Sequence, residues 1–129
     1  MRILGIDYGR KKIGLAVATS ILAEAYEVIR YETIGEAMKK IEKVAKEENV
    51  EKIVVGISEG QIGMETKFFA NELKKIVGNK VVFQDETLST VDAQSLAIDA
   101  DVKRKKRKNF EDAFAATVML QSYIDRVKG

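Results

Sequence analysis

Three carboxylates in this 129-residue chain occupy positions that folding would bring together. Asp7 closes a short apolar run, Glu86 follows a later one, and Asp112 falls in the first turn of a predicted helix. Asp85 and Glu59 are reserve candidates beside the same predicted strand ends. Converging carboxylates can hold two Mg²⁺ ions about 4 Å apart, which activate water and stabilise the leaving oxygen in phosphodiester cleavage. The pattern predicts metal-dependent hydrolysis.

The composition supports this chemistry by exclusion. The chain has no Cys and no His, which excludes disulfides, thiolate nucleophiles, cysteine-ligated zinc and every acid–base scheme built on imidazole. Carboxylates, Lys, Arg, Ser, Thr and Tyr remain, and carboxylate oxygens are suited to hard cations.

Each acid also has a structural interpretation. Asp112 near a helix N-terminus would favour the helix dipole by about 0.3–1 kcal/mol, and Asp85 and Glu86 could be turn or capping residues. Asp7 has no evident structural need, because it ends an apolar strand directly before Tyr-Gly. The glycine that follows, Gly9, fits a phosphate approaching backbone amides as well as it fits a tight turn.

Positive charge is concentrated in one segment. Six consecutive residues are basic, and the rest of the chain holds more acidic than basic residues. This distribution favours a polyanionic partner such as nucleic acid, although a solvated loop is the alternative. The predicted contacts are Gly9, Arg10, Lys11 and Lys12, together with Lys103, Arg104, Lys105, Lys106, Arg107 and Lys108.

Hydrophobic periodicity predicts five strands and four helices. The expected strands are 2–7, 13–18, 25–31, 52–57 and 80–84. The expected helices are about 35–48, one marked by Met64, Phe68, Phe69, Leu73 and Ile76 and closed near Gly78, one opened by Ser89 and Asp92, and one capped by Asn109.

This element order predicts an α/β fold with a five-stranded mixed sheet of order 3-2-1-4-5, in which only the second strand is antiparallel. Asp7 and Glu86 then lie at the same edge, where ligands gather in open α/β sheets. Their backbones are about 10 Å apart, since one strand separates them.

The chain length fits a single domain, 1–129, with one core. No stretch approaches the roughly 20 apolar residues of a membrane span, and no signal peptide is evident. The expectation is a cytoplasmic protein without membrane association.

Four ordered motifs resemble the YqgF family of the ribonuclease H-like superfamily. They are Asp7-Tyr-Gly-Arg-Lys-Lys-Ile-Gly-Leu-Ala16, Val54-Val-Gly56, Asp85-Glu-Thr-Leu-Ser-Thr90 and Glu111-Asp-Ala-Phe-Ala-Ala116. The resemblance spans the whole chain. It implies a nuclease that processes the 5′ end of pre-16S rRNA or cuts Holliday junction-like DNA. It also implies that Asp7, Glu86 and Asp112 are catalytic and hold Mg²⁺ or Mn²⁺.

Two residues depart from the family pattern. Thr87 replaces the usual Arg after Asp-Glu, and Ser58 stands where the family tends to carry Pro. A missing guanidinium weakens phosphate contact or stabilisation of the transition state. The alternative to an active nuclease is therefore a catalytically weak nucleic-acid-binding module of the same fold.

A third hypothesis is a nucleotide phosphotransferase, because Asp7-x-Gly followed by Gly14 on a hairpin resembles a phosphate-binding loop. That class closes two domains over its nucleotide, and the length supplies one. Whether the substrate is an rRNA precursor or branched DNA stays open, as does the choice between monomer and homodimer.

Overall fold

The computed structural model describes residues 2–78, 80–85 and 104–128, with the side chains of 104–112 and 128 left aside. The strands are β1 (Ile3–Asp7), β2 (Lys12–Ala18), β3 (Ala23–Arg30), β4 (Lys52–Ile57) and β5 (Val81–Asp85). The helices are α1 (Ile34–Glu47), α2 (Gly60–Val77) and α4 (Arg104–Lys128). The predicted helix opened by Ser89 lies outside the described residues.

The five strands form one sheet of order β3-β2-β1-β4-β5. The β1–β2 and β2–β3 pairs are antiparallel, while the β1–β4 and β4–β5 pairs are parallel. This confirms the predicted fold class and strand order. The strands β1, β4 and β5 therefore end at one side of the sheet, which we call the carboxyl edge.

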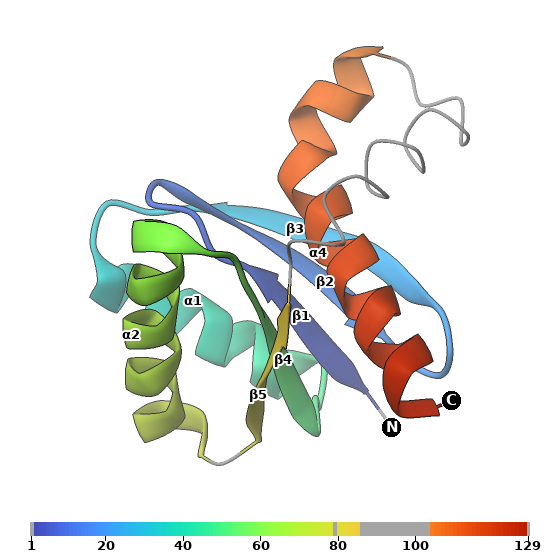
Figure 1. Cartoon of the computed structure of the whole chain (residues 1–129). Helices are drawn as coiled ribbons and strands as arrows, with labels where there is room; N and C mark the ends of the chain where they lie inside the picture. The colour runs from blue at the N-terminus through green and yellow to red at the C-terminus, as the bar shows by residue number, and fades with distance from the viewer. Residues whose placement is uncertain (1, 79, 86–103, 129) are drawn as a thin grey trace.

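Helices cover both faces of the sheet (Figure 1). Leu4, Ile6, Ile53 and Val55 point to the face covered by α1 and α2 and join the larger buried cluster. Ile3 and Val54 belong to the other face and pack with Met119, Leu120 and Tyr123 of α4. Both faces of β1 and β4 are thus buried, which explains why their sequences are continuously apolar rather than alternating.

Helix ends follow local signals on the α1 and α2 side. The Thr33 hydroxyl caps α1 by accepting a hydrogen bond from the Glu36 backbone N–H at 3.2 Å. Helix α2 ends at Gly78, whose φ of 87° is a left-handed value that favours glycine. The prediction that the second helix closes at Gly78 is confirmed.

The predicted start of the last helix was wrong. Helix α4 begins at Arg104, so Asn109 lies inside it and does not cap it. Its basic first turns carry no apolar periodicity, which is why the sequence pattern placed the start too late. The residues that mark α2 are of two kinds: Phe69 and Leu73 are buried, whereas Met64, Phe68 and Ile76 are 73%, 63% and 45% exposed.

Within the described part of the chain, no helix is both long and apolar enough to cross a membrane.

Candidate active site

Asp7 is the last residue of β1 and lies half-buried at the carboxyl edge. Its backbone pairs with Gly14 of β2, and the preceding residue of β1 pairs with Val55 of β4. The next row of the sheet pairs Gly56 of β4 with Gln84 of β5. The apolar strand β1 thus ends with a carboxylate at the edge of the sheet where the site was predicted.

The side of the sheet that Asp7 faces follows from strand alternation. Ile3 and Gly5 face α4, and a Cβ added to Gly5 would lie 2.9 Å from the Leu120 Cβ. Asp7 is two residues beyond Gly5 on the same strand, so it belongs to the same face, the one covered by α4. Helix α4 runs back along β1, since Ile3 packs near Tyr123 and Ile124 at the far end of the helix.

Helix α4 also carries Asp112. A Cβ on Gly5 would approach the Ala116 carbonyl to 3.4 Å, and Asp112 precedes Ala116 by about one turn of helix. Two strand residues from Gly5 to Asp7 advance about 6.6 Å, close to the rise of that turn. The backbone of Asp112 is therefore carried toward the same end of the sheet as Asp7.

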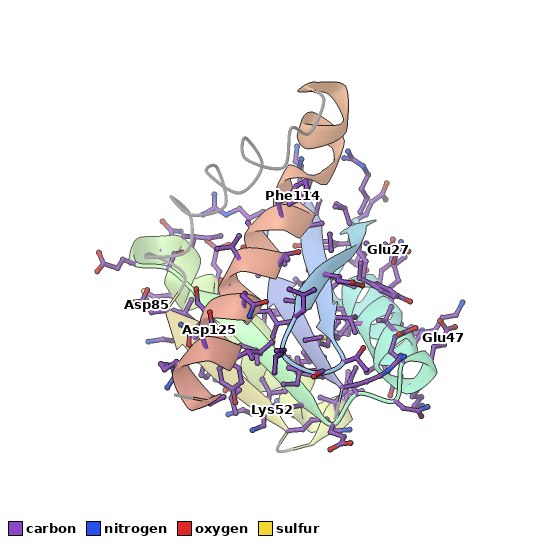
Figure 2. The ribbon with its side chains drawn as sticks, turned by 90° about the vertical axis from the view of Figure 1, so that its right-hand side faces the viewer. Glu27, Glu47, Lys52, Asp85, Phe114 and Asp125 are labelled. Atoms are coloured by element: carbon purple, nitrogen blue, oxygen red, sulfur yellow. The ribbon has the colours of Figure 1, made fainter. Side chains whose placement is uncertain are left out.

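The reserve candidates lie on the opposite side of the sheet. Asp85 ends β5 and is exposed, and its parity is that of Val81 and Phe83, which pack against the α1 and α2 cluster. Figure 2 views the sheet from the α4 side and labels Asp85 at the left of the ribbon. Glu59, at the N-cap position of α2, is also exposed and makes no side-chain capping bond.

Tyr31 fixes the turn between β1 and β2 through two hydrogen bonds. The Tyr31 hydroxyl donates to the Gly9 carbonyl, and the Tyr31 backbone N–H donates to the Lys11 carbonyl at 3.2 Å. Burial, and then hydrogen bonding with Tyr8, raises the pKa of Tyr31 well above its usual value, so the hydroxyl remains a donor at neutral pH. A Cβ on Gly9 would lie 2.4 Å from the Lys12 carbonyl, which favours the tight-turn interpretation of this glycine.

Arg10 makes a two-pronged ion pair with Glu65 of α2. Its Nε and one terminal nitrogen donate to the two Glu65 oxygens at 3.0 and 2.6 Å. Hydrogen bonding and charge from Arg10 lower the pKa of Glu65, so the pair is ionised at neutral pH. Sequence reasoning did not find Glu65, because its partner lies 55 residues away and neither spacing nor motif connects them.

Comparison with known proteins shows which family the chain belongs to. A family model described as "RuvX: Holliday junction resolvase" matches residues 1–126. The chain belongs to this family. Relatives named "Putative pre-16S rRNA nuclease" include one from Caldanaerobacter subterraneus, 39% identical with 99% of both chains covered, and one from Bacillus cereus, 40% identical with 98% of this chain and 99% of the relative covered.

Solved structures give the same fold at much lower identity. The RuvC of T. thermophilus in complex with a Holliday junction substrate aligns with a TM-score of 0.62 at 18% identity, covering 100% of this chain and 96% of that one. The fowlpox virus resolvase complex with Holliday junction DNA aligns with a TM-score of 0.64 at 14% identity, covering 100% of both. The predicted family, fold and nuclease class are confirmed.

The metal donors expected in this RuvX family member are only partly within the described residues. Glu86 lies outside them, and Asp112 is described by its backbone alone. Among the side chains that are described, no group of three or more His, Cys, Asp or Glu residues could hold a metal ion. Asp7 supplies the oxygen chemistry that fits a hard divalent cation. Its role, and those of Glu86 and Asp112, stay predictions.

The basic segment falls largely on α4. Arg104, Lys105, Lys106, Arg107 and Lys108 occupy the first turns of this helix, and Lys103 lies outside the described residues. The segment is therefore helical over these five residues and not the loop that was the alternative expectation. In this RuvX family member the helix that carries the basic residues is also the one that carries Asp112.

Proposed function

We propose that this protein is a divalent-metal-dependent nuclease that processes the 5′ end of pre-16S rRNA, with Holliday junction-like DNA as its second candidate substrate. The observation that carries the proposal is Asp7 at the carboxyl edge, facing the helix layer that brings Asp112 to the same end of the sheet. The names of relatives near 40% identity support the rRNA precursor, and the family description supports the junction.

In this proposal Asp7, Glu86 and Asp112 hold Mg²⁺ or Mn²⁺. The bound ions would lower the pKa of water and offset charge on the leaving oxygen. Strand alternation disfavours the reserve ligand Asp85, because its side chain belongs to the α2 face, opposite the face of Asp7. Glu59 belongs to the α2 side as well.

The substrate backbone would be held by charge. The proposed phosphate contacts are the side chains of the basic segment 103–108 and of Arg10, Lys11 and Lys12, together with the backbone amide of Gly9. Contacts of this kind give affinity that falls steeply with salt and carry little sequence information. Recognition of shape rather than sequence follows for this enzyme.

The Arg10–Glu65 pair gives a test of the first contact. Glu65 forms an ion pair with the Arg10 guanidinium, which a phosphate would otherwise contact. We therefore expect Glu65→Gln to tighten binding of a duplex RNA by about two- to tenfold at low salt and to steepen the salt dependence of binding. Fluorescence anisotropy in EDTA measures this binding. The matched control is Glu72→Gln, which removes the same charge from α2 but breaks a pair with Lys75. Equal tightening in both variants would show a net-charge effect and contradict the role of Arg10.

The proposed function is tested with two labelled substrates, a pre-16S rRNA 5′ segment and a four-way DNA junction, each with Mg²⁺, Mn²⁺ or EDTA. We expect metal-dependent cleavage of the rRNA segment at a defined position and weaker cleavage of the junction. Efficient cleavage of the junction alone would reverse the substrate order. Cleavage in EDTA would contradict the metal dependence.

A binding module is the second candidate, and Thr87 favours it because the family pattern has Arg there. The same assay separates the two functions. Salt-sensitive binding of both substrates without any cleavage would identify the module. A cytoplasmic location, the single domain and the choice between monomer and homodimer stay predictions.

A further inference from the structure

Helix α2 exposes two large apolar side chains on one face. Met64 and Phe68 are 73% and 63% exposed, and their spacing of four residues puts them one above the other on the helix surface. Both lie in the N-terminal half of α2, the half nearer the carboxyl edge (Figure 1). An aromatic and a thioether side chain exposed together near a candidate active site indicate a binding surface.

A hollow of about 450 Å³ lies beneath these side chains. Its inner wall includes Tyr8 and Phe69, whose rings are 4.8 Å apart and tilted by 37°. Phe69 is fully buried, so the wall is anchored in the core. Tyr8 directly follows Asp7 and has the opposite parity, so the hollow and the Asp7 carboxylate flank the same strand end from its two sides.

A second hollow of about 1100 Å³ adjoins the first, with Gln61 and Met64 lining both. It continues past the N-terminus of α2 to Phe83 and Asp85 at the end of β5, and Lys67 lies on its wall. We call the two hollows together the α2 trough. The trough therefore runs along the carboxyl edge from the neighbour of Asp7 to the neighbour of Glu86.

We propose that the α2 trough binds unpaired nucleotides of the substrate next to the cleavage point, with Phe68 and Met64 against base faces and Lys67 on a backbone phosphate. This inference rests on the proposed function, since it deepens the recognition of that same substrate. Base faces are apolar and their linking phosphates are anionic, which matches the apolar side chains of the trough and Lys67 in its wall. Glu59, Glu65 and Asp85 also line the trough, and Arg10 pairs with Glu65. In a duplex the faces are stacked inside the helix, so the trough selects unpaired nucleotides.

The position of the trough favours nucleic acid over a protein occupant. Its two ends include Tyr8 and Asp85, which are sequence neighbours of the proposed catalytic acids Asp7 and Glu86, so a protein that filled it permanently would cover the α2 side of the carboxyl edge. Arg10 lies at the same side, held by Glu65, whose side chain lines the smaller hollow. A strand that enters the trough would thus pass Arg10 as a second cation in addition to Lys67.

The test compares two RNA ligands, a blunt duplex and the same duplex with a five-nucleotide single-stranded extension. Binding is measured by fluorescence anisotropy in EDTA, which prevents cleavage. Stacking on one aromatic side chain is worth roughly 1–3 kcal/mol per base, so we expect Phe68→Ala to weaken binding of the extended duplex by about 5- to 150-fold. Met64→Ala should weaken it by a smaller factor, and Phe68→Trp should restore it. Binding of the blunt duplex should not change in any of these variants.

The matched control is Ile76→Ala, which removes another exposed apolar side chain from α2 but does not line the trough. It should bind both ligands as the parent protein does. Equal losses on both ligands, or no loss on the extended one, would overturn the proposal. A change in sedimentation mass in Phe68→Ala with unchanged binding would overturn it as well and would assign the face to a second copy of the chain.

Failure of the trough and failure of the proposed function give different results. If the parent protein binds the extended duplex in a Phe68-dependent way but never cleaves, the nuclease is contradicted and the trough stands. If it cleaves in a metal-dependent way with no preference for the extension, the trough is contradicted and the nuclease stands. Far-UV circular dichroism of each variant checks its folding, and Met64→Gln replaces Phe68→Ala if the latter is unfolded.

Discussion

Asp7→Asn is expected to reduce metal-dependent cleavage by about a thousandfold or more while the protein stays folded and still binds nucleic acid. The amide keeps the size of the side chain but removes the anionic oxygen donor that the proposed metal site requires. Metal ions contribute several kcal/mol to such reactions, and about 4 kcal/mol corresponds to roughly three powers of ten in rate. Binding should be unchanged or slightly tighter, because a negative charge leaves the path of a polyanion.

The assay is single-turnover cleavage of the better substrate at saturating Mg²⁺, with binding measured in parallel. Asp125→Asn is the matched control, since Asp125 lies near the other end of α4 (Figure 2) and accepts a hydrogen bond from Gln121 at 3.0 Å. That variant should cleave at the parent rate. Cleavage by Asp7→Asn within tenfold of the parent rate would contradict Asp7 as a metal ligand.

Strand order was predictable because the sheet is built from patterns that sequence displays directly. The apolar run that ends at Asp7 is buried on both faces, and Ile13 and Leu15 alternate with small residues on the neighbouring strand. Short connections between the first three strands force a meander, and right-handed crossovers fix where β4 and β5 are added. These rules depend on local patterns and chirality, so one sequence is enough to apply them.

Features that depend on tertiary contact were not predictable in the same way. The Glu65 carboxylate meets Arg10 only because α2 passes the β1–β2 turn. Apolar residues at helical spacing normally face the core, but Met64 and Phe68 are exposed. Only the structure shows which apolar residues of α2 face the core. Highly charged residues such as Lys105 and Lys106 give no apolar periodicity, so the start of α4 was missed.

The choice between the adjacent acids Asp85 and Glu86 depends on which face of β5 meets α4. Residues of β5 alternate between the two faces, with Phe83 on the α2 side and Gln84 reaching Arg126 of α4 at 3.0 Å. Counting that alternation forward assigns Asp85 to the side opposite Asp7. The sequence pattern alone did not reveal which set of residues faced α4, because both sets on this strand are partly apolar.

Gly63→Ala is expected to destabilise the fold by about 2–3 kcal/mol, although alanine is the better helix former. Gly63 is buried in the first turns of α2, and an added Cβ would lie 2.0 Å from the Ser58 carbonyl oxygen. That oxygen belongs to the backbone that joins β4 to α2, so it cannot move aside as a flexible side chain would. Relieving the clash between the new Cβ and this oxygen must displace either the end of β4 or the start of α2.

Chemical denaturation with urea measures the free energy of unfolding, and Gly35→Ala is the control. Gly35 lies in the first turn of α1, where an added Cβ would meet no atom within 4 Å. That variant should be unchanged or up to about 1 kcal/mol more stable, because alanine has less conformational entropy to lose than glycine. Equal stabilities for the two variants would show that the contact between Gly63 and Ser58 relaxes freely.

The strain should also have a functional readout. The residues beside Gly63 line the α2 trough, and any shift of the helix start moves Met64 and Gln61 with it. At temperatures where Gly63→Ala is still folded, we therefore expect weaker binding of the extended duplex and unchanged binding of the blunt duplex. A variant that loses stability but keeps full preference for the extension would place the binding of unpaired nucleotides elsewhere on the protein.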